Sequence, residues 1–153
     1  MAETPSLALV CRVAEHRVAF WAVDIFKVLA DPLLTRFPNL PWGILGITAH
    51  RGRIVTVADA GFFLFEEKPR TGSWARSALE ERVLLLDRGV RHLALRVDAV
   101  ESMEEIDRVP APIQNPATRD NRFLSPVKRG EEEVAIVDVK AMYDFLLHLP
   151  LGG

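Results

Sequence analysis

Short apolar runs that come in pairs around a polar corner constrain this 153-residue chain more than any other feature. Three of these corners contain Gly, which supplies the positive φ that tight hairpins require. Strands this short and this regularly spaced predict small barrels or a two-sheet sandwich. The predicted strand pairs are 7–13 with 17–21, 43–48 with 53–58, 82–86 with 91–97, and 123–127 with 133–137.

Two segments have helical spacing instead of strand spacing. The segment ADAGFFLF (58–65) is long enough for one or two turns of helix. The segment 138–149 predicts a longer helix, with Asp138 as its N-cap. Its apolar stripe, which we expect to pack on the body of the protein, consists of Val139, Met142, Phe145, Leu146 and Leu149.

The two halves of the chain resemble each other. RGRIVTVADAGFFL (51–64) aligns with RGEEEVAIVDVKAMYDFL (129–146), and each has an Arg-Gly corner, a strand that ends at Asp, and a helix. HRVAFWAVD (16–24) aligns with VRHLALRVD (90–98), although a register one residue away is nearly as good. The order of the matching segments is the same in both halves, which indicates an internal duplication.

The duplication predicts two subdomains of like topology. We place subdomain 1 at about 1–65, a connector at about 66–80, and subdomain 2 at about 81–149. Because a half of about 65 residues buries too little surface to be stable alone, the subdomains are expected to share apolar surface.

Charge and hydropathy exclude several classes of protein. The net charge of −2 gives no electrostatic basis for binding nucleic acid or a membrane surface. The apolar runs are too short to span a membrane, and the N-terminal residues do not form a signal peptide. Cys11 is the one cysteine, so an internal disulfide or a cysteine-based metal site is excluded. We expect a cytoplasmic protein without membrane insertion.

A search for catalytic chemistry finds no phosphate loop, zinc-protease motif or nucleophile elbow. We predict no catalytic residue, no metal site and no cofactor. Cys11 is interpreted as a buried, inert thiol. The aspartates at strand ends are interpreted as caps of the following turns, and these are Asp24, Asp59, Asp98 and Asp138. The histidines at strand ends are interpreted as solvent-facing, and these are His16, His50 and His92.

Four segments, spaced along nearly the whole chain, together resemble the CheW-like domain of bacterial chemosensory arrays. They are AFWAVDIFKVL (19–29), FPNLPWGILGITAHRGRIVTVAD (37–59), ALRVDAV (94–100) and FLSPV through VAIVDVKAMYDFL (123–146). The resemblance implies one CheW-like domain over 1–153, mainly β, with two small five-stranded β-barrel subdomains sharing an apolar core. Short helices and a C-terminal helix complete the implied fold.

The same resemblance implies a function. CheW-like proteins are non-enzymatic adaptors that join the cytoplasmic helical hairpin of chemoreceptors to the regulatory domain of a CheA-type histidine kinase. The Arg51-Gly52 corner matches the family's receptor-facing region, and Ile25 and Gly46 match positions in or near that surface. Lys27 stands where family members commonly have glutamate. The kinase-contact residues are not indicated.

Departures from the family pattern leave alternatives open. Ala49 and His50 precede Arg51 where the family usually has Asn and an apolar residue, and Pro126 replaces an expected Gly. These departures favour a dedicated partner in a separate chemosensory pathway at least as much as service in the main motility array. Lys27 also allows a ring-filling or inhibitory homologue that binds kinase but not receptor. A small β-barrel ligand-binding protein or enzyme is the alternative from another class.

Overall fold

The computed structural model describes residues 6–30, 32–66, 80–86, 93–108, 121–130 and 132–149. The predicted connector at 66–80 lies outside these residues except for its two ends.

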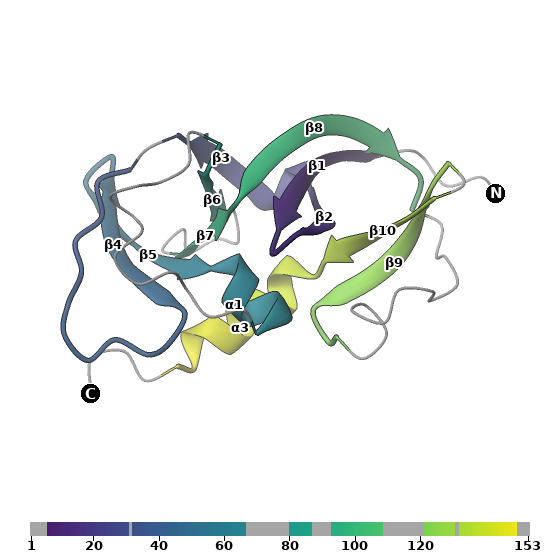
Figure 1. Cartoon of the computed structure of the whole chain (residues 1–153). Helices are drawn as coiled ribbons and strands as arrows, with labels where there is room; N and C mark the ends of the chain where they lie inside the picture. The colour runs from purple at the N-terminus through teal and green to yellow at the C-terminus, as the bar shows by residue number, and fades with distance from the viewer. Residues whose placement is uncertain are drawn as a thin grey trace.

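The protein consists of two five-stranded sheets (Figure 1). Sheet A has the order β8 (Ala99–Ile106), β1 (Ser6–Val13), β2 (His16–Trp21), β10 (Glu132–Val137) and β9 (Leu124–Arg129). Sheet B has the order β3 (Ile25–Leu29), β6 (Arg82–Leu86), β7 (Leu93–Val97), β5 (Arg53–Asp59) and β4 (Ile44–His50). The mainly β fold is confirmed. Among the described residues no hydrogen-bonded ladder joins the outer strands of either sheet, so the sheets are not closed barrels.

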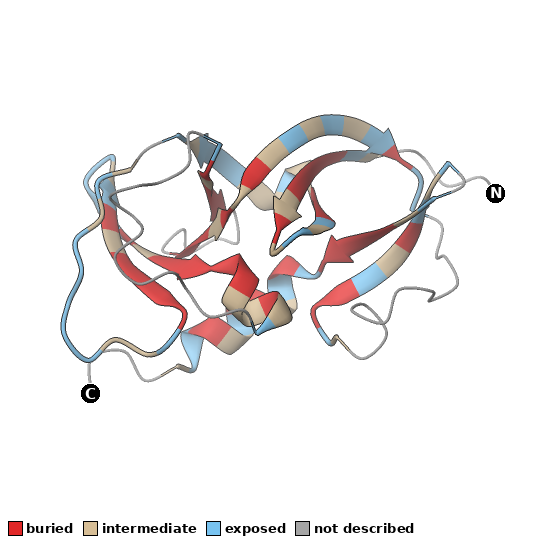
Figure 2. Ribbon diagram, viewed as in Figure 1, coloured by how far each residue is buried: buried red, intermediate tan, exposed pale blue. Residues whose placement is uncertain are grey.

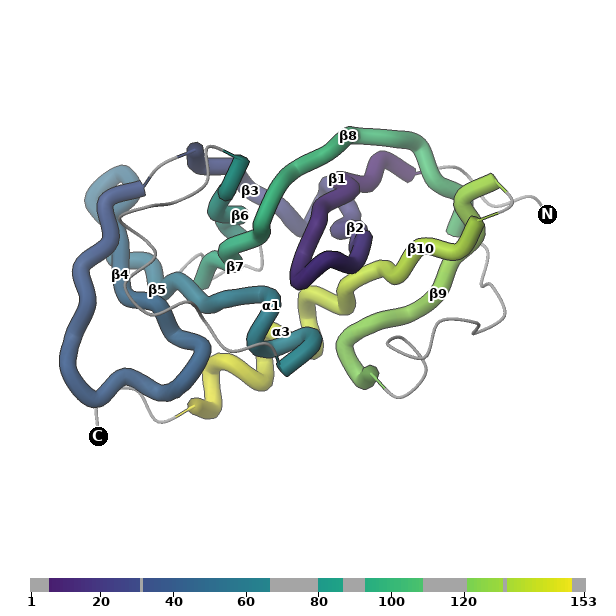
Figure 3. Tube along the Cα trace, in the orientation of Figure 1, coloured from purple at the N-terminus to yellow at the C-terminus, as the bar shows by residue number. Residues whose placement is uncertain are grey.

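The two sheets do not follow the predicted halves 1–65 and 81–149. Sheet B contains β3, β4 and β5 from the first half together with the β6–β7 hairpin, and sheet A contains the converse set. The short 3₁₀ helix η1 (Ala22–Asp24) lies between β2 in sheet A and β3 in sheet B. The Cα trace in Figure 3 shows β8 running likewise from the sheet B side over sheet A. Each apolar hairpin is thereby flanked on both sides by further strands.

The two sheets have the same topology, as the predicted duplication requires. If each strand is replaced by its counterpart in the other half of the chain, the strand order of sheet A becomes that of sheet B. The parallel pairs match as well, since β5 runs parallel to β7 as β10 runs parallel to β2. The parallel partners also fix the register. Ala135 lies beside Val18 and Thr56 beside Leu93, three residues before the cap of each helix. Val18 therefore corresponds to Leu93, which is the alternative register and not the preferred one.

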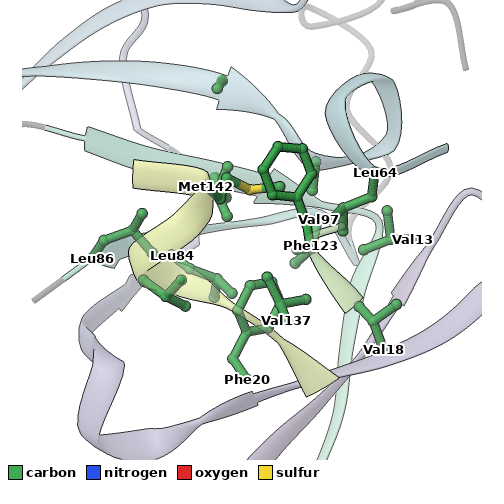
Figure 4. Packing of buried hydrophobic residues seen from close by; sticks show 14 of the residues in the cluster. Val13, Val18, Phe20, Leu64, Leu84, Leu86, Val97, Phe123, Val137 and Met142 are labelled. Atoms are coloured by element: carbon green, nitrogen blue, oxygen red, sulfur yellow. The ribbon is translucent and has the colours of Figure 1, made fainter. Parts of the chain in front are cut away.

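The core has three parts, because the central strands are buried on both faces. One set of side chains packs between the sheets, including Phe20, Leu84 and Met142 (Figure 4). Each sheet also covers a smaller cluster of its own. Ala8, Val10 and Ala19 of sheet A have counterparts in Val83, Leu85 and Ala94 of sheet B, each 75 residues later. Uninterrupted apolar runs such as 7–11 and 83–86 are the sequence signature of strands buried on both faces.

The helices α1 (Ala60–Phe65) and α3 (Val139–Leu147) lie together at the junction of the sheets (Figure 1). Asp138 accepts a hydrogen bond from the Ala141 amide at 3.0 Å, which confirms the predicted N-cap. Of the predicted stripe, Val139, Met142 and Leu146 are buried. Phe145 and Leu149 are partly buried and pack against the same core.

Two strands, β3 and β8, were not predicted. Both are outer strands, and the middle of β8 carries exposed and partly exposed residues in alternation (Figure 2). In β3 the central residues Phe26, Lys27 and Val28 are all exposed. Without a buried face over most of their length, these strands lack the apolar pattern that identifies the others.

Candidate functional site

The Arg51-Gly52 corner is a two-residue turn that joins β4 to β5. His50 and Arg53 close the hairpin as a pair, and Arg51 and Gly52 have φ values of 50° and 77°. This backbone is that of the mirror-image turns that match the twist of hairpin strands. Arg51 is exposed and makes no ion pair with any described residue. The corner therefore presents a free guanidinium at the tip of sheet B.

The role of Gly46 is to allow close backbone packing, and it does not form part of the exposed surface. It is buried, and a Cβ at this position would lie 2.5 Å from the carbonyl oxygen of Thr35. Thr35 and Ile47 exchange backbone hydrogen bonds of 2.8 and 2.9 Å across this contact. Gly46 thus lets the linker after β3 lie directly against β4, and it can affect a partner only through that linker.

Replacing Gly46 by Ala should lower the free energy of unfolding by about 1–3 kcal/mol, because φ is +149° and the methyl group meets backbone. Gly52→Ala is the matched control, since φ is also positive but no atom lies within 4 Å of the added Cβ. Urea melts of both variants measure the difference. A loss for Gly46→Ala no larger than for Gly52→Ala would show that the contact with Thr35 is unimportant.

A groove of about 570 Å³ opens between β4 and the linker that follows β3. Its rim includes Leu33 and Ile54, whose side chains are 87% and 63% exposed. The described residues that line it are mostly apolar and none of these is charged: Leu29, Ala30, Pro32, Leu33, Thr35, Ile47, Thr48, Ala49, His50 and Ile54. Such a groove suits an apolar segment of a partner better than a polar small molecule.

The two predicted receptor-facing residues of β3 differ in their surroundings. Lys27 is exposed on β3, two residues before the groove residue Leu29. Ile25 is partly buried and packs against the core between the sheets, outside the groove lining. The rings of Phe26 and His50 are 6.3 Å apart, which shows that β3 and the tip of β4 converge although they are opposite edges of sheet B.

The histidine interpretation needs correction at two positions. His50 lines the groove, and its Nε2 is buried without a hydrogen-bond partner among the described residues. His16 is partly buried and stacks on Phe65 at 4.2 Å. Both residues do lie at strand ends, but pairing of the hairpins turns their rings inward. His92 lies outside the described residues.

Asp59 and Asp138 cap the helices that follow them, as predicted, but Asp98 binds the turn of a different hairpin, and both Asp59 and Asp98 face Arg96. Asp59 caps α1 by accepting from the Gly61 amide at 3.3 Å, and Asp98 accepts from the Ala14 amide of the β1–β2 turn at 2.9 Å. Arg96 lies 3.1 Å from each of these carboxylates and also pairs with Glu81. Burial raises the pKa of Asp59, and Arg96 opposes that rise. This cluster ties β7, α1 and the first hairpin together.

Cys11 lies in the core, and the described residues do not group into a metal-binding cluster. Cys11 is fully buried, and burial, with a smaller contribution from Glu101, raises the pKa of its thiol to about 12. The inert thiol is therefore confirmed. Within the described ranges no group of three or more His, Cys, Asp or Glu side chains is placed to hold a metal ion. In the same ranges no helix is long and apolar enough to cross a membrane.

Comparison with known proteins decides the family. A family model for the CheW-like domain matches residues 7–145. The chain belongs to the CheW-like domain family. This family consists of scaffold and adaptor domains of chemosensory signalling, which confirms the resemblance of the four sequence segments.

Two relatives of this CheW-like chain support the assignment. Protein FrzA of Myxococcus xanthus is 35% identical over 65 residues, which are 42% of this chain and 41% of FrzA. The match therefore spans less than half the length of that relative. The crystal structure of scaffolding protein TtCheW from Thermoanaerobacter tengcongensis superposes with a TM-score of 0.70 at 25% identity, covering 87% of this chain and 84% of that one.

Within the CheW-like fold, sequence reasoning found the corner but missed the groove beside it. None of the five predicted residues is among the described residues that line the groove, although Arg51 and Gly46 each adjoin a lining residue in sequence and Lys27 is exposed two residues before Leu29. Leu29, His50 and Ile54 are the side chains that were missed. His50 carried the one usable signal, because it is polar where the family usually has an apolar residue.

Proposed function

We propose that this chain is a non-enzymatic, cytoplasmic adaptor that couples chemoreceptors to a CheA-type histidine kinase in a bacterial chemosensory pathway. The receptor's helical hairpin would contact the region of Ile25, Lys27, Gly46, Arg51 and Gly52, and the kinase would contribute its regulatory domain. The observation that carries the proposal is an unpaired Arg51 beside an apolar groove in a CheW-like fold. Apolar anchors supply affinity in such contacts, and charged groups at the rim supply specificity.

A second candidate is a ring-filling or inhibitory homologue that binds the kinase but not the receptor. It is favoured by Lys27, which is exposed on β3 and carries the charge opposite to the family's glutamate. A ligand-binding protein or enzyme is less well supported, because the described residues of the groove lining include no charged side chain and His50 is the one titratable group among them.

Arg51→Asp should weaken binding of a receptor hairpin fragment by about 2 kcal/mol or more, roughly 30-fold, because it replaces attraction by repulsion at the rim. It should leave the fold nearly intact, since an exposed charge contributes under about 1 kcal/mol to folding. Lys128→Asp, an exposed position on β9 in sheet A, is the matched control. Isothermal titration calorimetry against receptor fragment and kinase regulatory domain measures both contacts.

The outcomes separate the candidates. Wild-type affinity of Arg51→Asp for the receptor fragment would show that the corner is only a turn. Binding of the kinase domain alone by the wild-type protein would favour the ring-filling homologue. Binding of neither partner by the wild-type protein would contradict the adaptor proposal.

A further inference from the structure

The two sheets differ in the side-chain contacts between their two outer strands. In sheet A, Glu104 on β8 and Arg129 on β9 form a two-point ion pair, with nitrogen–oxygen distances of 2.8 and 2.5 Å. The Ser102 hydroxyl donates to the same carboxylate. Because β8 and β9 are the outer strands of sheet A, this pair bridges its edges where no ladder does. We call it the sheet A clasp.

The strand pairing identifies the residues of sheet B at the positions equivalent to Glu104 and Arg129. Glu104 faces Ala8, and Leu29 faces Val83, the counterpart of Ala8. Arg129 closes its hairpin with Glu132, as His50 closes the other with Arg53. Arg53 and Glu132 both lie six residues before the cap of the following helix. Leu29 therefore replaces Glu104, and His50 replaces Arg129.

This register also corrects the alignment of the two Arg-Gly pairs. Arg51-Gly52 and Arg129-Gly130 match in sequence, but in space Arg129 corresponds to His50 and Gly130 to Arg51. Arg129 is held inside the sheet A clasp, whereas Arg51 is on the exposed turn. The groove beside Arg51 is thus the counterpart of a seam that is clasped in the other sheet.

One buried polar atom in the groove has no hydrogen-bond partner among the described residues. The Nε2 of His50 has no partner among the described residues, and a buried polar atom left in this state is costly. The ring of Phe26 stands edge-on to the imidazole, and Phe26 is 41% exposed. Arg51 and Arg53 flank His50 at the hairpin tip, Lys27 follows Phe26 on β3, and all three are basic. Asp31 lies outside the described residues.

We propose that this groove seats an apolar helical segment of a partner protein that carries one carboxylate, and that this carboxylate pairs with His50 as Glu104 pairs with Arg129. The partner's carboxylate thus takes the role that Glu104 has in sheet A, because Leu29 at the equivalent position has no carboxylate. The inference rests on the proposed adaptor function and names the chemistry of its partner. A helix is favoured over an added strand, because Thr35 already occupies the free edge of β4 at Ile47.

The first arm of the test transplants the sheet A clasp into sheet B. Leu29→Glu combined with His50→Arg should close the groove and lower binding of an acidic amphipathic peptide at least tenfold. The matched control is the removal of an ion pair away from the groove, Arg17→Leu with Glu101→Leu on β2 and β8, which should leave peptide affinity unchanged. His50→Leu is a milder variant that keeps the groove apolar, and circular dichroism reports whether each variant folds.

The second arm varies the probe. Two synthetic 20-residue helical peptides share one leucine stripe and differ in a single residue beside it, Glu in one and Gln in the other. The Glu peptide should bind wild type about tenfold more tightly, with a salt-dependent difference. His50→Leu should abolish that difference.

Equal binding of the two peptides, no binding of either, or wild-type affinity in a folded transplant variant would each overturn the inference. None of these results alone would contradict the adaptor proposal, which the receptor and kinase titrations test separately. If Arg51→Asp loses receptor binding while the Glu and Gln peptides bind wild type equally, the adaptor proposal stands and the carboxylate contact with His50 is rejected.

Discussion

Replacing Arg96 by Met should lower the free energy of unfolding by about 3–5 kcal/mol, as for a buried ion pair that loses one partner. Arg96 is nearly buried and faces the carboxylates of Asp59, Glu81 and Asp98. Without it, the three acidic groups lose the cation that lies against all of them. Urea denaturation at neutral pH measures the loss.

The loss should depend on pH in a defined direction. Burial raises the pKa of Asp59 in the folded protein, so its contribution to stability is present in acid and is lost as pH rises through that pKa. Removing Arg96 removes the group that opposes this rise. The deficit of Arg96→Met relative to wild type should therefore shrink as pH falls from about 7 toward about 4, where carboxyl groups take up protons.

An exposed ion pair provides the control for Arg96. Arg17 lies 3.0 Å from Glu101, and its side chain is 61% exposed. Arg17→Met should cost less than about 1 kcal/mol and show little dependence on pH. A loss of similar size for Arg96→Met, or one that is constant with pH, would show that the buried cluster contributes no more than a surface pair.

The hairpins and the helices of this fold could be predicted from local sequence. Gly at a corner permits the turn, and apolar runs on both sides require burial, so pairs such as β4 and β5 follow from turn chemistry. Asp138 before an amphipathic stripe predicted α3 for the same local reason. These elements carry their own signals within a few residues.

The exchange of strands between the two halves could not be predicted in this way. β3 is followed and preceded by residues of its own half, yet it pairs with β6. Its exposed residues Phe26, Lys27 and Val28 form no pattern that indicates which strand it pairs with. The choice is made by burial of the hairpins from both sides, which is a property of the whole chain.

The candidate site was predictable only where a single turn defines it. Arg51 and Gly52 follow from the corner, but the groove requires Leu29, Thr35 and His50 to meet across the curve of sheet B. His50 was interpreted as solvent-facing because it lies at a hairpin tip. The side on which its ring lies depends on the pairing with Arg53 and on the approach of Phe26.

Leu84→Ala should lower the free energy of unfolding by about 3–5 kcal/mol, because Leu84 is fully buried in the core between the sheets. The predicted single domain over 1–153 adds a second expectation, that the variant still unfolds in one transition with fluorescence and circular dichroism coincident. Leu85→Ala is the matched control, since Leu85 is also buried but packs in the cluster of sheet B alone. If the sheets fold as one unit, both variants lose stability without a change in cooperativity. Two separated transitions in Leu84→Ala would instead show that the sheets are independent domains joined by a weaker interface.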